Sequence, residues 1–203
     1  MLKFDPHELS ERQNYKFLIG TIIPRPIAFI TSVAEDGTIN GAPFSYFNIV
    51  SSNPPMISVA IQRKNCLPKD TARNIKQKGE FVVHIVDDQN VEKINMTAAT
   101  LPPNESEIEK AELTLVASDK ISVPGIKESK VRFECVLVDT IELGEKGNVE
   151  TDLIIGKIVL FHIGEEIYFE NGRINHEKLE AVSRLAGHHY AKIGEVFTLE
   201  RPK

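Results

Sequence analysis

The sequence predicts a mainly β protein with a few helices, and three observations lead to this fold class. The apolar runs are short and rich in β-branched residues, and turn residues separate them at short intervals. Such a pattern is typical of an antiparallel barrel or sandwich. At 203 residues, with 41% hydrophobic and 26% charged residues, the chain can bury one sizeable core. We therefore expect a single domain over residues 1–203.

Seven apolar runs are the candidate strands. The first two flank Glu35-Asp36-Gly37, which predicts a hairpin because Gly tolerates the positive φ of tight hairpin turns. Asn171-Gly172 indicates another turn near the carboxyl end. The predicted strands are Ile27–Val33, Ile39–Ser45, Ile57–Gln62, Glu80–Ile85, Lys130–Leu143, Asp152–Ile163 and the short Ile167–Phe169.

A few helices accompany these strands. Asp70–Lys78 begins with an Asx residue, which we expect to act as the N-cap. It ends with a basic turn followed by Gly79, as helix-dipole and capping preferences favour. The other predicted helical segments are Asp88–Thr97, Asn175–Ala186 and a short turn within Glu105–Glu112.

The charge balance excludes some classes of partner. Lys and Arg number 24 against 29 Asp and Glu, which gives a formal net charge of -5. The chain therefore has no general attraction to nucleic acid or to an anionic membrane, and we expect neither as a partner. No stretch approaches the roughly 20 apolar residues of a membrane-spanning helix, and the amino terminus lacks the apolar core of a signal peptide, so we expect a cytoplasmic protein. Any anionic ligand must be held by a local site.

Common catalytic and metal-binding motifs are missing from the sequence. It contains no phosphate-binding Gly-x-x-x-x-Gly-Lys, no Gly-x-Gly-x-x-Gly, no Gly-x-Ser-x-Gly and no paired-histidine zinc motif. Cys66 and Cys135 lie far apart in ordinary strand or loop sequence, so we expect reduced thiols. The adjacent His188 and His189 would point in different directions, which favours surface or interface positions over chelation. We therefore expect no metal site.

A polar, hydroxyl-rich loop is predicted at residues 45–52, after the second strand. Backbone donors and acceptors at such a sheet end can form hydrogen bonds with the polar edge of a heterocycle, while Tyr46 and Phe47 offer aromatic surface. Ser51 and Ser52 can donate to phosphate oxygens. The alternative is that the prolines of this region only break edge strands and its serines only cap turns.

The start of the predicted helix at residue 70 is a second candidate binding element. Its unpaired amides and positive dipole end, together with Lys69 and the hydroxyl of Thr71, can bind a phosphate. Asp70 would repel a phosphate at close range, which favours the N-cap role for this residue. Alternatively, the nearby Lys64 and Arg73 are only solvated surface charges.

Several segments share the order and spacing of one known family. They are Ile23–Ala28, Asn40–Asn48, Lys69–Thr71 with Asn74-Ile75, Gly79–Val83, Phe133–Cys135, Ile141–Gly144, Ile154–Val159, His162, and Arg184–Gly187 with Tyr190-Ala191. As a set, these segments resemble the flavin reductase-like domain family, in its flavoredoxin-type branch. The resemblance covers roughly residues 15–195. One departure is Ala186-Gly187, where relatives usually have two glycines.

This resemblance implies a split β-barrel, FMN held noncovalently at the barrel rim, and a homodimer whose partner helps to enclose the flavin. Nine residues fall in the family's cofactor-binding motifs. The ring and ribityl chain are expected to contact Ser45, Tyr46 and Asn48; the phosphate side is expected to include Ser51, Ser52, Lys69 and Thr71, with Arg25 and Asn74 as further contacts.

The reaction that the resemblance implies is hydride transfer from NADH or NADPH to the flavin, followed by electron transfer to free flavin, a partner oxygenase, a metal complex or another redox protein. Because the cofactor carries this chemistry, no catalytic acid or base is assigned. Two alternatives stay open: a flavoredoxin-like electron carrier or flavin-binding protein without its own NAD(P)H oxidation, and a ligand-binding or regulatory barrel without flavin. No dinucleotide fingerprint distinguishes NADH from NADPH, and nothing specifies the terminal acceptor.

The carboxyl-terminal segment Asn175–Tyr190 is predicted to be a lid or dimer-interface element. An open barrel rim must be covered to bury a planar ring, and Leu179, Val182 and Leu185 would form an apolar stripe on the predicted helix. The alternative is that this helix packs only on its own barrel.

Overall fold

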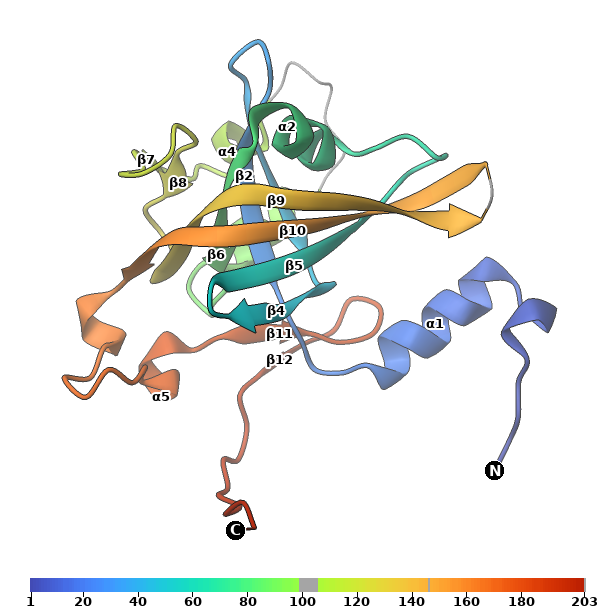
Figure 1. Ribbon diagram of the computed structural model, residues 1–203. Helices are drawn as coiled ribbons and strands as arrows, with labels where there is room; N and C mark the ends of the chain where they lie inside the picture. Colours follow the sequence, from blue (N-terminus) through green and yellow to red (C-terminus); the bar gives the residue numbers. More distant parts are fainter. Residues whose placement is uncertain (99–105, 146, 203) are drawn as a thin grey trace.

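A curled, seven-stranded antiparallel sheet forms the centre of the computed structural model, which describes residues 1–98, 106–145 and 147–202 (Figure 1). The strand order is β3-β2-β6-β9-β10-β5-β4. β3 and β4 lie at opposite ends of this order, yet only Ser45 and Tyr46 separate them in sequence. The sheet must therefore curl until its two edges meet at this link, which produces a barrel split between β3 and β4. The strands are β2 (Ala28–Val33), β3 (Ile39–Phe44), β4 (Phe47–Ser52), β5 (Pro55–Gln62), β6 (Glu80–Ile85), β9 (Val131–Glu145) and β10 (Asn148–Ile163).

The strands predicted between residues 27 and 163 are confirmed, with their ends shifted by a few residues. The predicted hairpin at Glu35-Asp36-Gly37 is confirmed as well. Gly37 has a φ of 90°, and the amide of Ala34 donates to the carbonyl of Thr38 at 2.9 Å. β2 and β3 consequently pair in register, with Thr31 opposite Gly41.

Alternate residues of the strands fill the barrel interior. On β5 the buried Ile57, Val59 and Ile61 alternate with more exposed neighbours, because side chains of a strand point to opposite faces in turn. Phe81 of β6 is fully buried next to Gly156 of β10. A Cβ added at Gly156 would lie 2.4 Å from Cζ of Phe81, so glycine is what permits this close approach of ring and backbone.

Helix α2 (Asp70–Lys78) packs on the barrel core through Ala72 and Ile75, and its predicted bounds are confirmed. Gly79 ends it with a φ of 74°. The predicted N-cap is wrong, because Lys69 is the N-cap and makes no side-chain cap bond. Asp70 already belongs to the first turn, where its carboxylate pairs with the guanidinium of Arg73 at 2.5 Å.

A second apolar cluster lies on the other side of β2. Phe29 of that strand packs here with Ile94, Ile108 and Ile126, which come from short elements outside the barrel. The predicted helix at Asp88–Thr97 begins only at residue 91, and Glu105 of the predicted turn lies outside the described residues. The short elements are α3 (Val91–Met96), α4 (Glu107–Lys110), β7 (Leu115–Val116) and β8 (Gly125–Ile126).

Helix α1 (Glu11–Thr21) was not expected from the sequence. Ser10 and Gln13 form a capping box at its start, just after the 3-10 turn η1 (Pro6–Glu8). Only Ile19 is buried, and the helix extends away from the barrel in Figure 1. A helix that buries so little shows no clear apolar stripe in its sequence. Within the described ranges, no helix is both long enough and apolar enough to span a membrane.

The loop expected at residues 45–52 is a strand from Phe47 onward. β4 pairs with β5 alone, and a bulge interrupts the pairing between Ile49 and Ser51. Polar side chains suggested a loop, but an edge strand has one partner only and can expose its serines and asparagine to solvent.

The helix predicted at Asn175–Ala186 is also wrong. Only α5 (His176–Leu179) is helical, and Glu180 ends it with a left-handed φ of 55°. β11 (Val182–Arg184) then pairs with both β1 (Arg25–Pro26) and β12 (Tyr190–Lys192) in a small sheet of order β1-β11-β12. Pairing with β1, which lies far away in sequence, thus overrides the local helical stripe. The strand expected at Ile167–Phe169 is likewise replaced, by the 3-10 turn η2 (Glu165–Ile167) and an isolated bridge between Tyr168 and Ile174.

Candidate functional site

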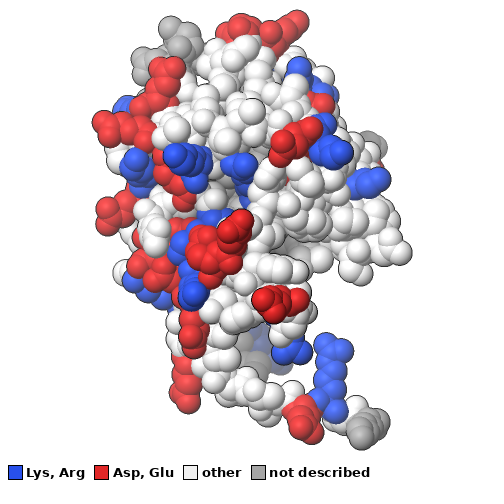
Figure 2. Space-filling model, turned by 90° about the vertical axis from the view of Figure 1, so that its left-hand side faces the viewer, with Lys and Arg blue, Asp and Glu red and all other residues white. Residues whose placement is uncertain are grey.

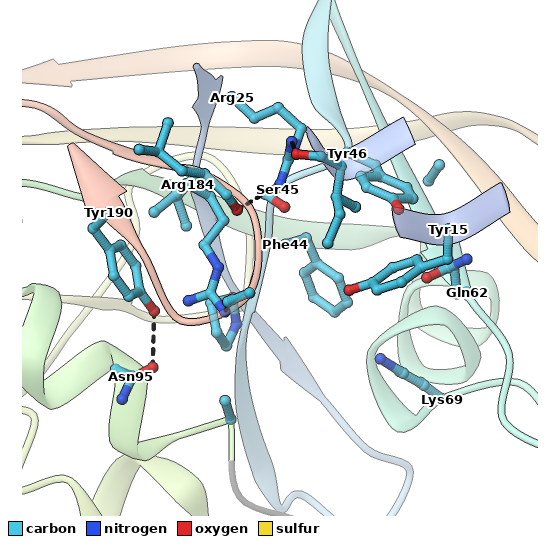
Figure 3. A pocket seen from close by; sticks show the side chains of 17 residues that line it. Tyr15, Arg25, Phe44, Ser45, Tyr46, Gln62, Lys69, Asn95, Arg184 and Tyr190 are labelled. Atoms are coloured by element: carbon cyan, nitrogen blue, oxygen red, sulfur yellow. Dashed lines mark hydrogen bonds between the residues drawn. The ribbon is translucent and has the colours of Figure 1, made fainter. Parts of the chain in front are cut away.

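A cavity of about 270 Å³ opens beside the split of the barrel (Figure 3). Residues of α1, β1, the β3–β4 link, β5, α3 and the β11–β12 hairpin wall it, and Lys69 adds the start of α2. The two ends of the chain thus converge on the seam where the barrel edges meet. This convergence explains why no single sequence motif describes the site.

Three cations and no carboxylate line this cavity, as far as the described residues go: Arg25, Lys69 and Arg184. None of them takes part in an ion pair of the described chain. A protein with a net charge of -5 has here collected positive charge without its own counter-charge. Such an arrangement is suited to an anionic ligand.

Lys69 lies at the rim of the cavity, with Nζ 5.8 Å from the centroid of the Phe44 ring. Partial burial lowers the pKa of its ammonium, and the nearby Lys64 lowers this pKa further. A bound anion would favour the charged form again. Because Lys69 is also the N-cap of α2, an anion here would meet the positive end of that helix as well.

Arg25 is 6% exposed and joins three segments. Its Nη1 donates to the carbonyls of Ile19 and Ile22, at the carboxyl end of α1, at 2.9 and 2.5 Å. Its Nη2 donates to the carbonyl of Leu185, in the β11–β12 turn, at 3.0 Å. Nε is buried and has no hydrogen-bond partner within the described chain. Arg25 therefore fixes two cavity walls, while its buried Nε has no acceptor among the described residues.

Arg25, Arg184 and Tyr190 form a row across the small sheet. Arg25 lies directly opposite Arg184 in the β1–β11 pair, and Arg184 lies opposite Tyr190 in the β11–β12 pair. The guanidinium carbon of Arg184 is 4.4 Å from the centroid of the Tyr190 ring, and Nη2 donates to the carbonyl of Gly187 at 2.6 Å. Like charges directly opposite each other destabilise a sheet, so this register favours an anion beside the two arginines.

Ser45 and Tyr46 form the link at the seam and both line the cavity. The carbonyl of Tyr46 accepts from the amide of Ala60 at 2.8 Å, which fixes the link on β5. The hydroxyl of Tyr46 is buried without a partner in the described part of the chain. Burial raises its pKa, with Tyr15 adding to the shift, so this hydroxyl is neutral and able to donate.

The other five predicted cofactor contacts do not line this cavity. On β4, Oδ1 of Asn48 accepts from the amide of Ile49 at 2.8 Å and Oγ of Ser51 accepts from the amide of Asn53 at 3.2 Å, and Ser52 is exposed. Thr71 and Asn74 are buried under α2, where Asn40 Nδ2 donates to Thr71 Oγ1 at 2.9 Å and Asn74 Nδ2 to Ser32 Oγ at 3.2 Å. Of the nine predicted contacts, four line the cavity of a single chain: Arg25, Ser45, Tyr46 and Lys69.

Several side chains of the cavity were not among the predicted contacts. Arg184 and Tyr190 lie in a segment that carries the family resemblance. The sequence therefore identified them as part of a motif, but it did not predict that they line the cavity. Asn95, whose Oδ1 accepts from the Tyr190 hydroxyl at 2.8 Å, had no sequence signal, and neither did Tyr15 on the unexpected helix α1.

Outside the cavity, one group of three side chains has the spacing of metal ligands within the described ranges: Asp119, Glu134 and His162. Nε2 of His162 is 2.6 Å from Oε1 of Glu134, while Nη2 of Arg132 is 3.3 Å from Nδ1. Because arginine only donates, Nδ1 accepts and Nε2 carries the proton. Glu134 also accepts the amides of Asp119 and Lys120 at 2.7 Å, so the group anchors a loop.

The remaining candidates behave as surface or core residues. His188 and His189 are exposed, as expected. Cys66 is an exposed free thiol and Cys135 a buried one. Figure 2 shows acidic and basic side chains mixed along one face, without a broad area of a single sign.

Fold and cavity together define a class of protein: a split β-barrel with an electropositive, aromatic cavity at its seam. Residues 19–178 match the family described as "Flavin reductase like domain", and the chain belongs to this family.

Solved structures agree with this assignment. Nitrilotriacetate monooxygenase component B from Bacillus cereus is 57% identical, with a TM-score of 0.96 and 98% of each chain covered. 2-Nitrobenzoate 2-nitroreductase NbaA from Pseudomonas fluorescens is 29% identical, with a TM-score of 0.89 over 99% of this chain and 96% of that one. A protein with a split barrel domain from Shewanella frigidimarina, 22% identical, shares the fold over 100% of both chains with a TM-score of 0.85. The predicted split-barrel fold is thereby confirmed.

Proposed function

We propose that this protein binds FMN noncovalently in the cavity at the seam and reduces it with NADH or NADPH. The observation that carries the proposal is the cavity lining of three cations and no carboxylate among the described residues, in a chain of the flavin reductase-like family. The buried hydroxyl of Tyr46, which has no partner among the described residues, supports it, because a buried polar atom generally needs a hydrogen-bond partner.

The residues present suit both parts of FMN. Lys69 and the first amides of α2 would hold the phosphate, and Arg73 offsets the charge of Asp70, which would otherwise oppose a phosphate there. Phe44 and Tyr46 would contact the ring, and the backbone of the Ser45–Tyr46 link offers hydrogen bonds to its polar edge.

Bound FMN would supply the redox chemistry, taking a hydride from the nicotinamide and passing electrons on. The chain's own task is to bind, orient and exclude water, and no side chain is proposed as an acid or base. The similarity to a monooxygenase component B supports a partner oxygenase as one acceptor. The reaction is proposed to take place in the cytoplasm.

We also propose a homodimer that covers the open side of the seam. The edge strand β4 carries Ile49 at 77% and Val50 at 50% exposure, and α1 exposes Leu18 at 53%. A second copy against these surfaces would bury apolar area and bring Asn48, Ser51 and Ser52 of β4 into an interface. Light scattering with and without FMN tests this point, and a monomeric protein with tight FMN binding would contradict it.

The deciding experiment is the visible spectrum of the purified protein, followed by anaerobic addition of NADH or NADPH. A yellow protein that bleaches supports the reductase. A yellow protein that does not bleach would be an electron carrier instead. A protein that stays colourless after titration with FMN would refute flavin binding altogether.

A further inference from the structure

We infer that Arg184, held on the ring of Tyr190, is a second anion-binding subsite that takes the phosphate groups of the nicotinamide dinucleotide. This inference rests on the proposed function. The row of Arg25, Arg184 and Tyr190 provides the first argument, because it sets two like charges opposite each other, and no carboxylate of the described residues lines the cavity beside them. Backbone carbonyls that accept from the two guanidiniums offset part of this repulsion, and an anion beside them would relieve it further.

Arg184 is held in place before any ligand arrives. Stacking at 4.4 Å from the Tyr190 centroid and the bond to Gly187 orient the guanidinium, and the bond from Tyr190 to Asn95 orients the ring. A guanidinium has five N–H donors, and one of those of Arg184 is used within the described residues. Its planar fork matches phosphate oxygens, and its prior orientation limits the entropy lost on binding.

Arg25 supplies an independent sign of a ligand at the same place. Its side chain is 6% exposed, and its Nε is a buried donor without a partner in the described chain, although both Nη atoms are bonded. Nε lies on a residue that lines the same cavity as Arg184. An acceptor from a bound molecule would satisfy it.

The FMN phosphate does not account for this second charge. Lys69 and Tyr190 lie on opposite sides of the cavity in Figure 3, with Arg184 between Tyr190 and Phe44. FMN carries one phosphate, which Lys69 and the start of α2 would hold. The arginine row is therefore free for a second anionic molecule.

The shape of the neighbouring surface suggests what that molecule is. Asn95 and Tyr190 also line an adjoining groove of about 280 Å³, whose floor includes the apolar Val91 and Val182. A ligand that reaches from the cavity over Arg184 into this groove would extend beyond the cavity proposed for FMN and would place its middle beside the guanidinium. A dinucleotide has this form.

The groove also favours NADH over NADPH. Asp88 and Glu92 line it, and its one basic residue, Lys192, is already paired with Asp88 at 2.6 Å. Carboxylates accept hydrogen bonds from ribose hydroxyls but repel the additional phosphate of NADPH.

The test compares Arg184→Met with Arg173→Met, which removes an exposed arginine from the turn before α5. Anaerobic flavin reduction is followed at increasing NADH concentration. We expect Arg184→Met to raise the half-saturating NADH concentration about 10- to 100-fold, with FMN affinity and the limiting rate changed less than about twofold. Arg184→Lys, which keeps the charge but not the planar stack, should recover part of the loss. Arg173→Met should behave as wild type.

An unchanged half-saturating NADH concentration in Arg184→Met would overturn the subsite. A loss of FMN affinity as large as the loss of NADH affinity would also overturn it, because it would assign the arginine row to the flavin. Failure of the proposed reductase looks different, because wild-type flavin would then not bleach at all. In that case inorganic pyrophosphate is titrated into the wild-type and Arg184→Met holoproteins. Weaker binding by the variant supports the subsite, and equal or absent binding refutes it.

Discussion

Lowering the pH from 8 to 5 should destabilise this protein by about 2 kcal/mol through His84 alone. His84 is fully buried between two backbone groups: Nδ1 is 3.0 Å from the carbonyl of Phe29, and Nε2 accepts from the amide of Ile126 at 2.9 Å. These partners require a neutral imidazole with its proton on Nδ1. Burial lowers its pKa from 6.5 to about 3.

The direction of the effect follows from which state binds the proton. Below pH 6.5 the imidazole of the unfolded chain is protonated, whereas the folded protein keeps it neutral down to about pH 3. The unfolded state therefore binds more protons throughout this window, and stability falls as the pH falls. At pH 5, which is 1.5 units below the unfolded value, about 1.4 kcal/mol per unit gives a loss of about 2 kcal/mol.

Urea unfolding at pH 8 and pH 5 measures this loss, with His84→Gln as the test and the exposed His188→Gln as the control. The carboxylates of Asp152 and Glu134 have lowered pKa values, so their contributions are lost only at pH values below about 4.5. His84→Gln should be less stable than wild type at pH 8 but lose about 2 kcal/mol less on going to pH 5. If wild type and His84→Gln lose the same free energy, the buried neutral histidine is not the cause.

Three further changes test the cavity and the core. Lys69→Met should weaken FMN binding about tenfold or more but change riboflavin binding little, and added salt should reduce the difference in wild-type affinity between FMN and riboflavin. Equal losses of affinity for both flavins, measured by flavin fluorescence, would show that the phosphate does not bind at Lys69. Tyr46→Phe removes a hydroxyl without a described partner, so the unfolding free energy should hold or rise while flavin affinity falls; a clear loss of stability in urea would show that the hydroxyl is satisfied within the protein. Gly156→Ala should cost about 1–3 kcal/mol, because its Cβ would meet the ring of Phe81 at 2.4 Å, whereas Gly20→Ala, with nothing within 4 Å, should be neutral or stabilising; similar melting temperatures for the two would contradict this packing.

The barrel strands were predictable because local signals and tertiary structure agree there. β2 and β3 have alternating or continuous β-branched sequence, a glycine turn between them, and the pairing that such a turn dictates. The carboxyl end of α2 was predictable from Lys78 and Gly79, whereas its N-cap was not. The segment after Asn175 was not predictable in this way, because its leucines and valine suit a helix, whereas the strand it pairs with, β1, lies about 160 residues earlier.

The candidate site was only partly predictable for a related reason. Lys69 and Tyr46 belong to segments whose polar pattern stands out locally, and both line the cavity. Ser51 and Thr71 carry the same kind of pattern, yet within one chain Thr71 bonds Asn40 and Ser51 lies on the outer edge strand. Arg184 lines the cavity because the long-range pairing of β11 with β1 places it opposite Arg25.

The two-residue link between β3 and β4 has a consequence for folding. β2–β3 and β4–β5 are both local hairpins, and the link ties them into one unit before distant parts of the chain are needed. The long β9–β10 hairpin must then insert between β6 and β5, with contacts such as Glu80 opposite Val136. The chain segments that separate β9 and β10 from their partners β6 and β5 are long, and closing long loops is slow. We therefore expect this insertion to limit the folding rate. A chain that ends before residue 131 would have much of the cavity wall but would lack β9 and β10, which join the two halves of the barrel. Tight ligand binding would therefore indicate that the barrel has closed.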